Sequence, residues 1–284
     1  MHRFWKSIIR PCCEVLLPKT LVEIGTAAGL NTTNILEYCR SSGARFHAID
    51  PAPHKNFEKT LAGLEDFGEF HRELSLNVLD HVTGDIVLID GDHNWYTVYN
   101  ELRLIEAAAK SADRPFPTIF LHDVHWPYGR RDLYYEPSRI PEEFRQPFIR
   151  QGIVLGESQT TKTGGYNYKH FNARTEGGVR NGVLTAVEDF IGQAVIEYQL
   201  RQIPGFHGLG ILFSPDQIPA SKLAQIEKIV AVPPQIKDHL EILEAERLYG
   251  LIALSNTYWK LGGYPGPRIA RLVKSARLFS RRMK

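Results

Sequence analysis

The stretch TLVEIGTAAG, residues 20–29, contains the pattern that decides the fold. Its first six residues form an apolar run that stops at Gly25, and the next four form a turn of small residues that ends at Gly29. Residues 30–41 then have the pattern of a helix. A buried strand that passes through a tight turn into a helix is the first half of a βαβ unit, so the stretch predicts a parallel sheet.

The alternation of strand and helix continues along the chain. Apolar runs predict strands at 45–50, 85–89 and 117–121, and helical patterns lie between them at 54–65 and 94–111. The second of these runs, DIVLI, is almost continuously apolar, as in a strand that is covered on both faces. In such a sheet, the loops at the carboxyl ends of the strands lie along one edge and carry the functional residues.

The C-terminal part of the chain predicts a hairpin followed by helices. Strands at 195–201 and 207–213 are joined by a turn at Pro204 and Gly205, and helices are predicted at 219–229, 235–260 and 266–282. We therefore predict an α/β fold with a doubly wound, Rossmann-like, mostly parallel sheet that ends in an antiparallel hairpin. The expected organisation is an N-terminal helix at 1–19, a central domain at 20–215 and a helical extension at 216–284.

Residues 124–180 interrupt the alternation. They hold nine aromatic residues, nine Lys or Arg and six Asp or Glu, with Pro and Gly scattered among them. A long irregular segment inside a compact domain is usually functional or disordered, and its aromatic content argues against disorder. We predict that this insertion forms a lid or a wall of the substrate site.

Composition excludes several classes of protein. The chain has 284 residues, of which 43% are hydrophobic and 23% charged, as in an ordinary globular protein. No apolar stretch approaches the roughly 20 residues needed to cross a bilayer, and the first 20 residues are too polar for a signal peptide. Cys12, Cys13 and Cys39 do not make a disulfide framework and are expected to be small buried residues. We expect a cytoplasmic protein with reduced thiols.

The net charge of +2 is unevenly distributed. Seven of the 34 Lys and Arg residues lie in the acid-free segment 264–284, which leaves 27 against 32 acids in the rest of the chain. The acidic body argues against nucleic acid as a partner. The basic helix expected at 266–282 suits either peripheral contact with an anionic membrane or docking on the body or a second subunit. Apolar positions in 235–260 suit a core or the seam of a homodimer.

The first candidate site is the turn after residues 20–25 together with Asp50. Small residues let the backbone approach a ligand closely, and the following helix begins with free N–H groups. Asp50 ends the next strand, where an acid accepts hydrogen bonds from ribose hydroxyls. A tight βα turn alone would explain the glycines, but glycines and acid together indicate a cofactor that contains a nucleoside.

The second candidate site combines two strand ends. Asp90, Asp92 and His93 follow one buried strand, and His122, Asp123 and His125 follow the next. Neighbouring carboxylates repel each other unless a cation or a proton lies between them, and oxygen ligands suit a hard cation. A histidine also serves as a general base at neutral pH. The simpler interpretation is that Asp92 or His93 only caps the following helix.

The motifs LVEIGTAAG, HAIDP, DIVLIDGDHNW and IFLHDV resemble those of class I S-adenosylmethionine-dependent methyltransferases. Within that superfamily, residues 15–215 resemble bacterial sugar and natural-product O-methyltransferases, including the macrocin O-methyltransferase and cephalosporin-hydroxylase-like group. The resemblance implies a seven-stranded sheet with an antiparallel terminal hairpin. It also implies S-adenosyl-L-methionine as the cofactor and a divalent cation, usually Mg²⁺.

The resemblance implies roles for individual residues. The cofactor would lie against Glu23, Gly25, Thr26, Gly29, Asp50, Ser75 and Asp90. The cation would be held by Asp90, His122 and Asp123. Members of the family often have two acids, or an acid and an amide, where this chain has His122 and Asp123, and a neutral histidine is a poorer ligand for magnesium.

The chemistry expected from this resemblance is the transfer of an activated methyl group to a sugar hydroxyl of a glycan or glycosylated metabolite. The site would orient the acceptor, and a cation on its oxygen would lower its pKa. Asp90 would belong to the catalytic residues, and His93 or His122 would accept the proton of the hydroxyl. In the lid, aromatic rings would stack on the acceptor and arginines would pair with an anionic group on it. The aromatic candidates are Trp126, Tyr128, Tyr134 and Tyr135, and the arginines are Arg130, Arg131 and Arg139.

Two other functions compete with this hypothesis. A nicotinamide-dependent oxidoreductase would share the fold, but the GxGxxG fingerprint is absent after the first strand. A non-catalytic or scaffold protein could keep the fold without turnover, but the acids and histidines at the strand ends argue against it.

Overall fold

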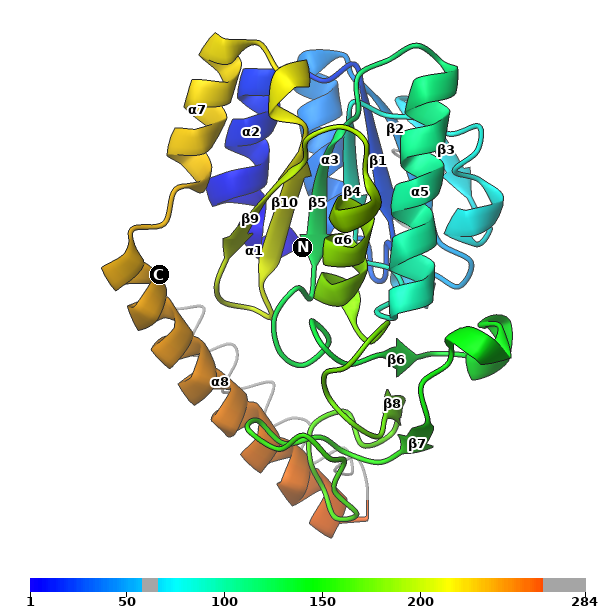
Figure 1. Cartoon of the computed structure of the whole chain (residues 1–284), viewed down its shortest axis with the longest axis vertical. Coiled ribbons are helices and arrows are strands. Elements are labelled where there is room, and N and C mark those ends of the chain that lie inside the picture. The colour runs from blue at the N-terminus through cyan, green and yellow to red at the C-terminus, as the bar shows by residue number, and fades with distance from the viewer. Residues whose placement is uncertain (58–65, 263–284) are drawn as a thin grey trace.

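The computed structural model describes residues 1–57 and 66–262. At its centre is a seven-stranded sheet with the order β3-β2-β1-β4-β5-β10-β9, shown in Figure 1. The strands of this sheet are β1 (Thr20–Ile24), β2 (Arg45–Ile49), β3 (Gly68–His71), β4 (Ile86–Ile89), β5 (Thr118–His122), β9 (Gln199–Ile203) and β10 (Leu209–Phe213).

The pairing of these strands confirms the predicted fold class. Strands β3, β2, β1, β4 and β5 are parallel, whereas β10 runs antiparallel to both β5 and β9. The strand β3 was not predicted, because it is a four-residue edge strand that begins with a glycine. A Cβ atom at Gly68 would overlap the carbonyl group of Phe46, so the tight pairing of β3 with β2 needs glycine there.

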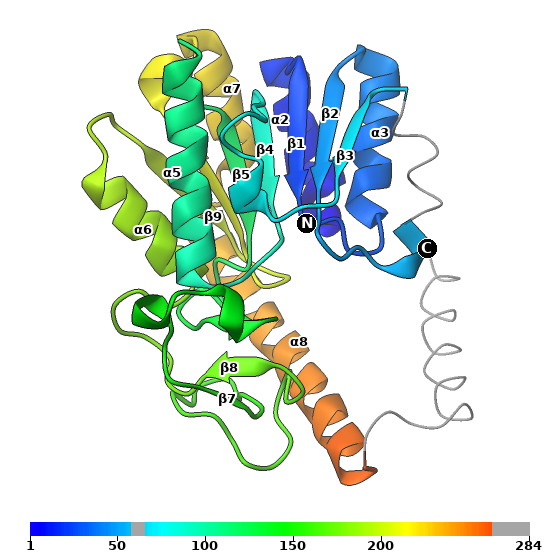
Figure 2. The same cartoon turned by 90° about the vertical axis from the view of Figure 1, so that its right-hand side faces the viewer.

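Helices cover both faces of the sheet, as Figures 1 and 2 show. The helices α5 (Trp95–Ser111) and α6 (Val183–Gln193) cover one face of the sheet. Their apolar side chains pack against Val22, Val87 and Ile119 on the strands. The opposite face carries Leu21, Phe46 and Phe120 under a second group of helices among the described residues. These are α1 (His2–Phe4), the π-helix Trp5–Ile9, α2 (Arg10–Leu16), α3 (Leu30–Ser42) and α7 (Ala220–Val230). Apolar side chains on alternate sides of each strand explain why the sheet has a helical layer on each face.

The segment after β5 builds a small second sheet below the carboxyl edge of the main one. Its three strands are β6 (Leu133–Tyr134), β8 (Phe171–Ala173) and β7 (Phe148–Arg150), in that order. The 27-residue helix α8 (Pro234–Lys260) runs alongside it (Figure 2), and the Asn256 Oδ1 accepts a hydrogen bond of 2.6 Å from the Gly165 amide. The lid predicted at 124–180 is therefore an ordered subdomain that α8 braces.

Most of the expected elements occur within a few residues of their predicted bounds. The single helix expected at 1–19 is instead α1, a π-helix turn and α2, and it ends at Leu17 in a left-handed conformation. The helix expected at 54–65 lies mostly outside the described residues, which include only a short 3₁₀ turn at Lys55–Phe57, and the helix expected at 266–282 lies wholly outside them. Across the described parts of the chain, no helix is both long and apolar enough to span a membrane.

Candidate active site

A cavity of about 430 Å³ opens at the carboxyl edge of the sheet. Its walls come from the loops after β1, β2, β3 and β4, from α5 and from the lid. Of the predicted site residues, it is lined by Gly25, Asp50, Ser75, Asp90, Tyr134, Tyr135 and Arg139. The predicted fold therefore brings four loops that are far apart in sequence to one pocket.

The loop after β1 passes unusually close to the loop after β4. Gly25 has a φ of +86°, and a Cβ atom there would overlap the carbonyl oxygen of Asp90. Only glycine tolerates both the left-handed conformation and the close approach. This contact places Asp90 beside the loop after β1.

Asp50, predicted to bind ribose hydroxyls, also holds the loop after β1 in place through hydrogen bonds. Its Oδ2 accepts hydrogen bonds from the Thr26 amide and hydroxyl, at 2.9 and 3.0 Å, and from the Ala27 amide at 3.2 Å. Its Oδ1 accepts one from the Ala52 amide at 2.8 Å. Asp50 lines the cavity, but only Oδ1 has lone-pair capacity left for a ligand hydroxyl.

Glu23 lies behind the cavity and is directed at α3. It is 2% exposed and accepts hydrogen bonds from Asn31 Nδ2 at 2.8 Å and Thr32 Oγ1 at 2.6 Å. Burial raises the pKa of its carboxyl to about 7, against the opposing effect of these two bonds. Glu23, Thr26 and Gly29, the residue that precedes α3 with a φ of +79°, are not among the residues that line the cavity. These three residues therefore support the loop after β1 on the side away from the cavity.

The far end of the cavity holds a buried acid that sequence reasoning missed. Glu101 on α5 is fully buried, lines the cavity, and accepts a hydrogen bond of 2.5 Å from the Ser75 hydroxyl through Oε1. Its Oε2 has no hydrogen-bond partner among the described residues. Burial raises the pKa of this carboxyl to about 8. A lone acid within an amphipathic helix gives no signal in the sequence, because acids there normally face solvent.

Four side chains meet where β4 and β5 end. His122 Nδ1 lies 2.7 Å from Asp123 Oδ2 and 3.2 Å from Asp90 Oδ1, so this histidine bridges the two carboxylates. His93 Nε2 lies 3.5 Å from the same Asp123 oxygen. Asp123 adopts a φ of +60°, a strained backbone conformation for a residue with a side chain, which is often found at functional sites. Asp90, His93, His122 and Asp123 therefore cluster as predicted, whereas His125 Nε2 instead lies 3.2 Å from Gln202 Oε1.

The two carboxylates of this cluster determine the charge of His122. Burial by itself lowers the pKa of His122, but the Asp90 and Asp123 carboxylates outweigh it and raise the pKa to about 9. The pKa of Asp123 is held at about 2 against the effect of burial by His93 and His122, and that of Asp90 is also well below its usual range. At neutral pH His122 is thus an imidazolium between two carboxylates, a poor general base and a poor metal ligand.

The cluster nevertheless offers donors for a divalent cation. Asp90, His93 and Asp123 each present one ligand atom, and these atoms lie within 4.8 Å of one another. The donor set differs from the predicted one in having His93 in place of His122. Two carboxylates and an imidazole suit Mn²⁺, Fe²⁺ or Zn²⁺ better than Mg²⁺, which prefers oxygen ligands.

The N-terminal residues border the same cluster. The Met1 ammonium lies 2.9 Å from Asp90 Oδ2, and the Phe4 ring meets His122 edge-on with ring centroids 6.1 Å apart. Together with His122, the ammonium surrounds Asp90 with positive charge, which explains the low pKa of its carboxyl.

Two of the predicted acceptor-binding aromatics belong to the interior of the lid. Tyr128 is 2% exposed, and its hydroxyl donates to Asn172 and accepts a bond of 2.7 Å from Asn167. Its ring stacks on His93 with centroids 5.8 Å apart, so it positions that histidine. Trp126 packs against Tyr166.

The predicted arginines are also engaged within the protein. Arg131 is completely buried and donates to the carbonyl oxygens of Ala173 and Ser158, at 2.6 and 2.8 Å. Arg130 pairs with Glu188 on α6. Neither is among the residues that line the cavity, whereas Arg139 and the half-exposed Tyr135 are.

The sequence from β1 to just after β5, which contains most of this cavity, also carries a family match. Residues 22–124 match a methyltransferase domain. The match covers less than half of the chain and leaves the lid, the terminal hairpin and α8 outside it. The matched segment thus contains Gly25, Asp50, Asp90, Glu101 and Asp123, and the lid lies outside it.

Solved structures show similar chains. One is the S-adenosylhomocysteine-bound methyltransferase PaMTH1 of Podospora anserina, with 14% identity, a TM-score of 0.41, and coverage of 72% of this chain and 76% of that one. Another is the 1,6-didemethyltoxoflavin-N1-methyltransferase of Burkholderia thailandensis, with 14% identity, a TM-score of 0.40, and coverage of 72% and 76%. No curated protein sequence matches this chain.

Proposed function

We propose that this protein is an S-adenosylmethionine-dependent O-methyltransferase that acts on a sugar hydroxyl. One observation carries the proposal. Residues 22–124 match a methyltransferase domain, and Asp90 belongs both to the cavity and to the carboxylate–histidine cluster of Asp90, His93, His122 and Asp123. One side of Asp90 faces the proposed cofactor cavity. The other side faces the groups able to bind or deprotonate an acceptor.

The cavity volume of about 430 Å³ is in the range of small-molecule sites, and its polar lining suits the proposed cofactor. Asp50 Oδ1 retains capacity to accept a hydrogen bond from a ribose hydroxyl, and Gly25 lines the same cavity through its backbone. The unpartnered Oε2 of Glu101, next to Ser75, suits the amino group or a ring nitrogen of adenine. When bound, S-adenosylmethionine supplies an already activated methyl group, so the protein has to orient and deprotonate the acceptor.

We assign the role of general base, which accepts the proton of the acceptor hydroxyl, to His93 rather than to His122. His122 is already protonated at neutral pH, because two carboxylates raise its pKa to about 9. His93 is 9% exposed, and Asp123 at 3.5 Å would stabilise the positive charge that His93 gains on accepting a proton. The Tyr128 ring stacked on His93 holds the imidazole in place.

Cation assistance is the second part of the proposal. Asp90, His93 and Asp123 would hold the ion, which would lower the pKa of the acceptor hydroxyl. In that arrangement His93 is a ligand, whereas without the ion it is free to accept the proton. Turnover with and without a chelator therefore distinguishes the two arrangements.

The part of the lid that borders the cavity favours a sugar as the acceptor. Tyr135 is 54% exposed at the cavity and offers a ring face for stacking, and Arg139 and Glu136 form an ion pair beside it. A polar rim with one exposed aromatic suits a hydroxylated ring better than an extended apolar acceptor. The basic segment 264–284, proposed to contact a membrane surface or a second subunit, lies outside the described residues.

The decisive experiment is isothermal titration of the purified protein with S-adenosylhomocysteine, with Mg²⁺ or Mn²⁺ and again after chelation. Micromolar binding in both conditions supports the cofactor and places the cation on the acceptor side. Binding only with the cation would mean that the ion organises the cofactor pocket. A folded, cofactor-free protein that binds in neither condition would overturn the proposal.

A matched pair of variants tests the cluster. Asp123→Ala should abolish turnover of a sugar acceptor while S-adenosylhomocysteine affinity changes less than threefold. Asp238→Asn, at an exposed acid on α8, should leave both unchanged. Unaltered turnover in Asp123→Ala would remove Asp123 from the mechanism.

A further inference from the structure

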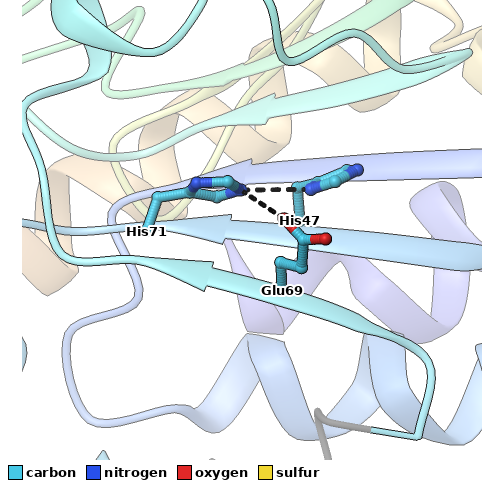
Figure 3. Close-up of side chains that lie close together, drawn as sticks. All are labelled: His47, Glu69 and His71. Atoms are coloured by element: carbon cyan, nitrogen blue, oxygen red, sulfur yellow. Dashed lines mark hydrogen bonds and ion pairs between the residues drawn. The ribbon is translucent and has the colours of Figure 1, made fainter.

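A second cluster of metal-type ligands lies on the main sheet, away from the carboxylate–histidine cluster. It consists of His47 on β2 and of Glu69 and His71 on the edge strand β3, shown in Figure 3. Each residue presents one ligand atom, and the three atoms lie within 4.8 Å of one another.

The strand register explains why these side chains meet. His47 is directly opposite Glu69, and the next pair on the same face is Ile49 opposite His71. Because side chains alternate along a strand, His47, Glu69 and His71 share one face, while Phe46 and Ala48 point into the opposite core. The parallel pairing of β2 and β3 therefore holds the three groups together without any help from a loop.

The distances resemble those of a tetrahedral metal site. With metal–ligand bonds of about 2.1 Å, tetrahedral geometry separates ligand atoms by about 3.4 Å. His47 Nδ1 lies 3.1 Å from His71 Nε2, and Glu69 Oε2 lies 3.9 Å from the same nitrogen. The Glu69 side chain is 65% exposed, so it can close the remaining gap at little cost.

The charge state of the cluster also suits a metal. Burial and mutual repulsion lower the pKa of His47, and burial is the largest influence that lowers the pKa of His71, although Glu69 opposes it. Burial therefore favours the neutral form of both imidazoles, which is the form that binds a metal. A metal-free protein would use the short contact as a hydrogen bond between two neutral rings, which is the competing explanation.

We propose that His47, Glu69 and His71 form a binding site for a transition-metal ion, with Zn²⁺ as the preferred occupant. Two imidazoles and one carboxylate are a donor set typical of zinc, and three protein ligands leave a fourth position for water. The ion would fasten the short edge strand β3 to β2.

The position of the site gives it a consequence for the cofactor cavity. The His71 carbonyl accepts a hydrogen bond of 3.0 Å from the Asp50 amide, and the chain after His71 leads directly to Leu74 and Ser75 in the cavity wall. An ion that holds His71 would therefore steady two parts of the cofactor cavity without touching its contents. This consequence rests on the proposed function, but the metal site itself does not.

The test is metal binding to the full chain after treatment with a chelator. Zn²⁺ titration, with Co²⁺ as a spectroscopic substitute, should show a site that is lost in His71→Ala and at least tenfold weaker in Glu69→Ala, beside any site at Asp90, His93 and Asp123. Visible absorption of bound Co²⁺ should report tetrahedral nitrogen and oxygen ligands. Because Glu69 is exposed, its substitution tests the site even if removal of a histidine impairs folding.

Asp123→Asn is the matched control, because it alters the other candidate metal cluster. The site should persist in this variant with unchanged affinity. Absence of Zn²⁺ binding in Asp123→Asn, or zinc binding that survives Glu69→Ala and a folded His71→Ala when each is combined with Asp123→Asn, would overturn the proposal. S-adenosylhomocysteine binding is measured separately, so failure of the metal site is distinguishable from failure of the methyltransferase proposal.

Discussion

Replacement of Glu101 by glutamine should increase the stability of the protein at neutral pH while weakening cofactor binding. The carboxyl is fully buried, and its pKa is about 8 in the folded protein against an ordinary value of 4.5. Between these two values the unfolded chain is ionised and the folded protein holds the proton. The folded state then binds more protons, so the free energy of unfolding falls as pH rises.

The magnitude follows from the size of the shift. Each pH unit between the two pKa values costs about 1.4 kcal/mol, so Glu101 should remove about 2–3 kcal/mol of stability between pH 5 and pH 7. Glutamine keeps the oxygen that accepts from Ser75 but does not ionise. The difference in stability between variant and wild type should therefore grow with pH and level off near pH 8.

The assay is urea unfolding of the cofactor-free protein at pH 5, 6, 7 and 8, followed by titration with S-adenosylhomocysteine. Glu23 has a pKa raised to about 7 and contributes a slope of the same sign, but it is present in both proteins and cancels in the difference. We expect affinity to fall about tenfold in the variant. A difference in stability that does not change with pH would refute the reasoning about burial, and unchanged affinity would remove Glu101 from the cofactor site.

Three further outcomes are expected. Gly25→Ala should abolish S-adenosylhomocysteine binding and lower the unfolding midpoint, because the new Cβ strains a φ of +86° and overlaps the Asp90 carbonyl; calorimetry and circular dichroism check this. His93→Gln should lower kcat by about 10²- to 10⁴-fold with little change in S-adenosylhomocysteine affinity, measured by methyl transfer. His122→Gln should remove about 3 kcal/mol of stability at pH 6, and progressively less as pH rises from 6.5 toward 9. The reason is that wild-type His122 is protonated through that range only in the folded protein. Urea unfolding at several pH values checks this, and a difference in stability that stays constant with pH would contradict it.

The fold and the location of the site could be predicted because their signals are local. The apolar runs at 85–89 and 117–121 and the small-residue turn at 26–29 indicate strands and a βα turn without reference to any other part of the chain. The edge strand β3 was missed because four residues beginning with Gly68 have little strand signal of their own. Its position depends on pairing with β2.

The roles of individual side chains were less predictable. The sequence offered Arg130 and Arg131 as anion-binding groups, but the structure uses them to tie the lid to itself and to α6. It offered His93 and His122 as equal candidates for the base, and the carboxylates on two sides of His122 distinguish them. The burial of Glu101 beside Ser75 had no signal at all.

The sequence by itself determined the order of strands and helices and the placement of acids at the strand ends, because hydrophobic periodicity acts over a few neighbouring residues. Only the tertiary structure decided the proton on His122, the orphaned oxygen of Glu101 and the meeting of His47 with Glu69 and His71. Those properties depend on desolvation and on distances between atoms that lie 20 or more residues apart along the chain, and folding alone sets such distances.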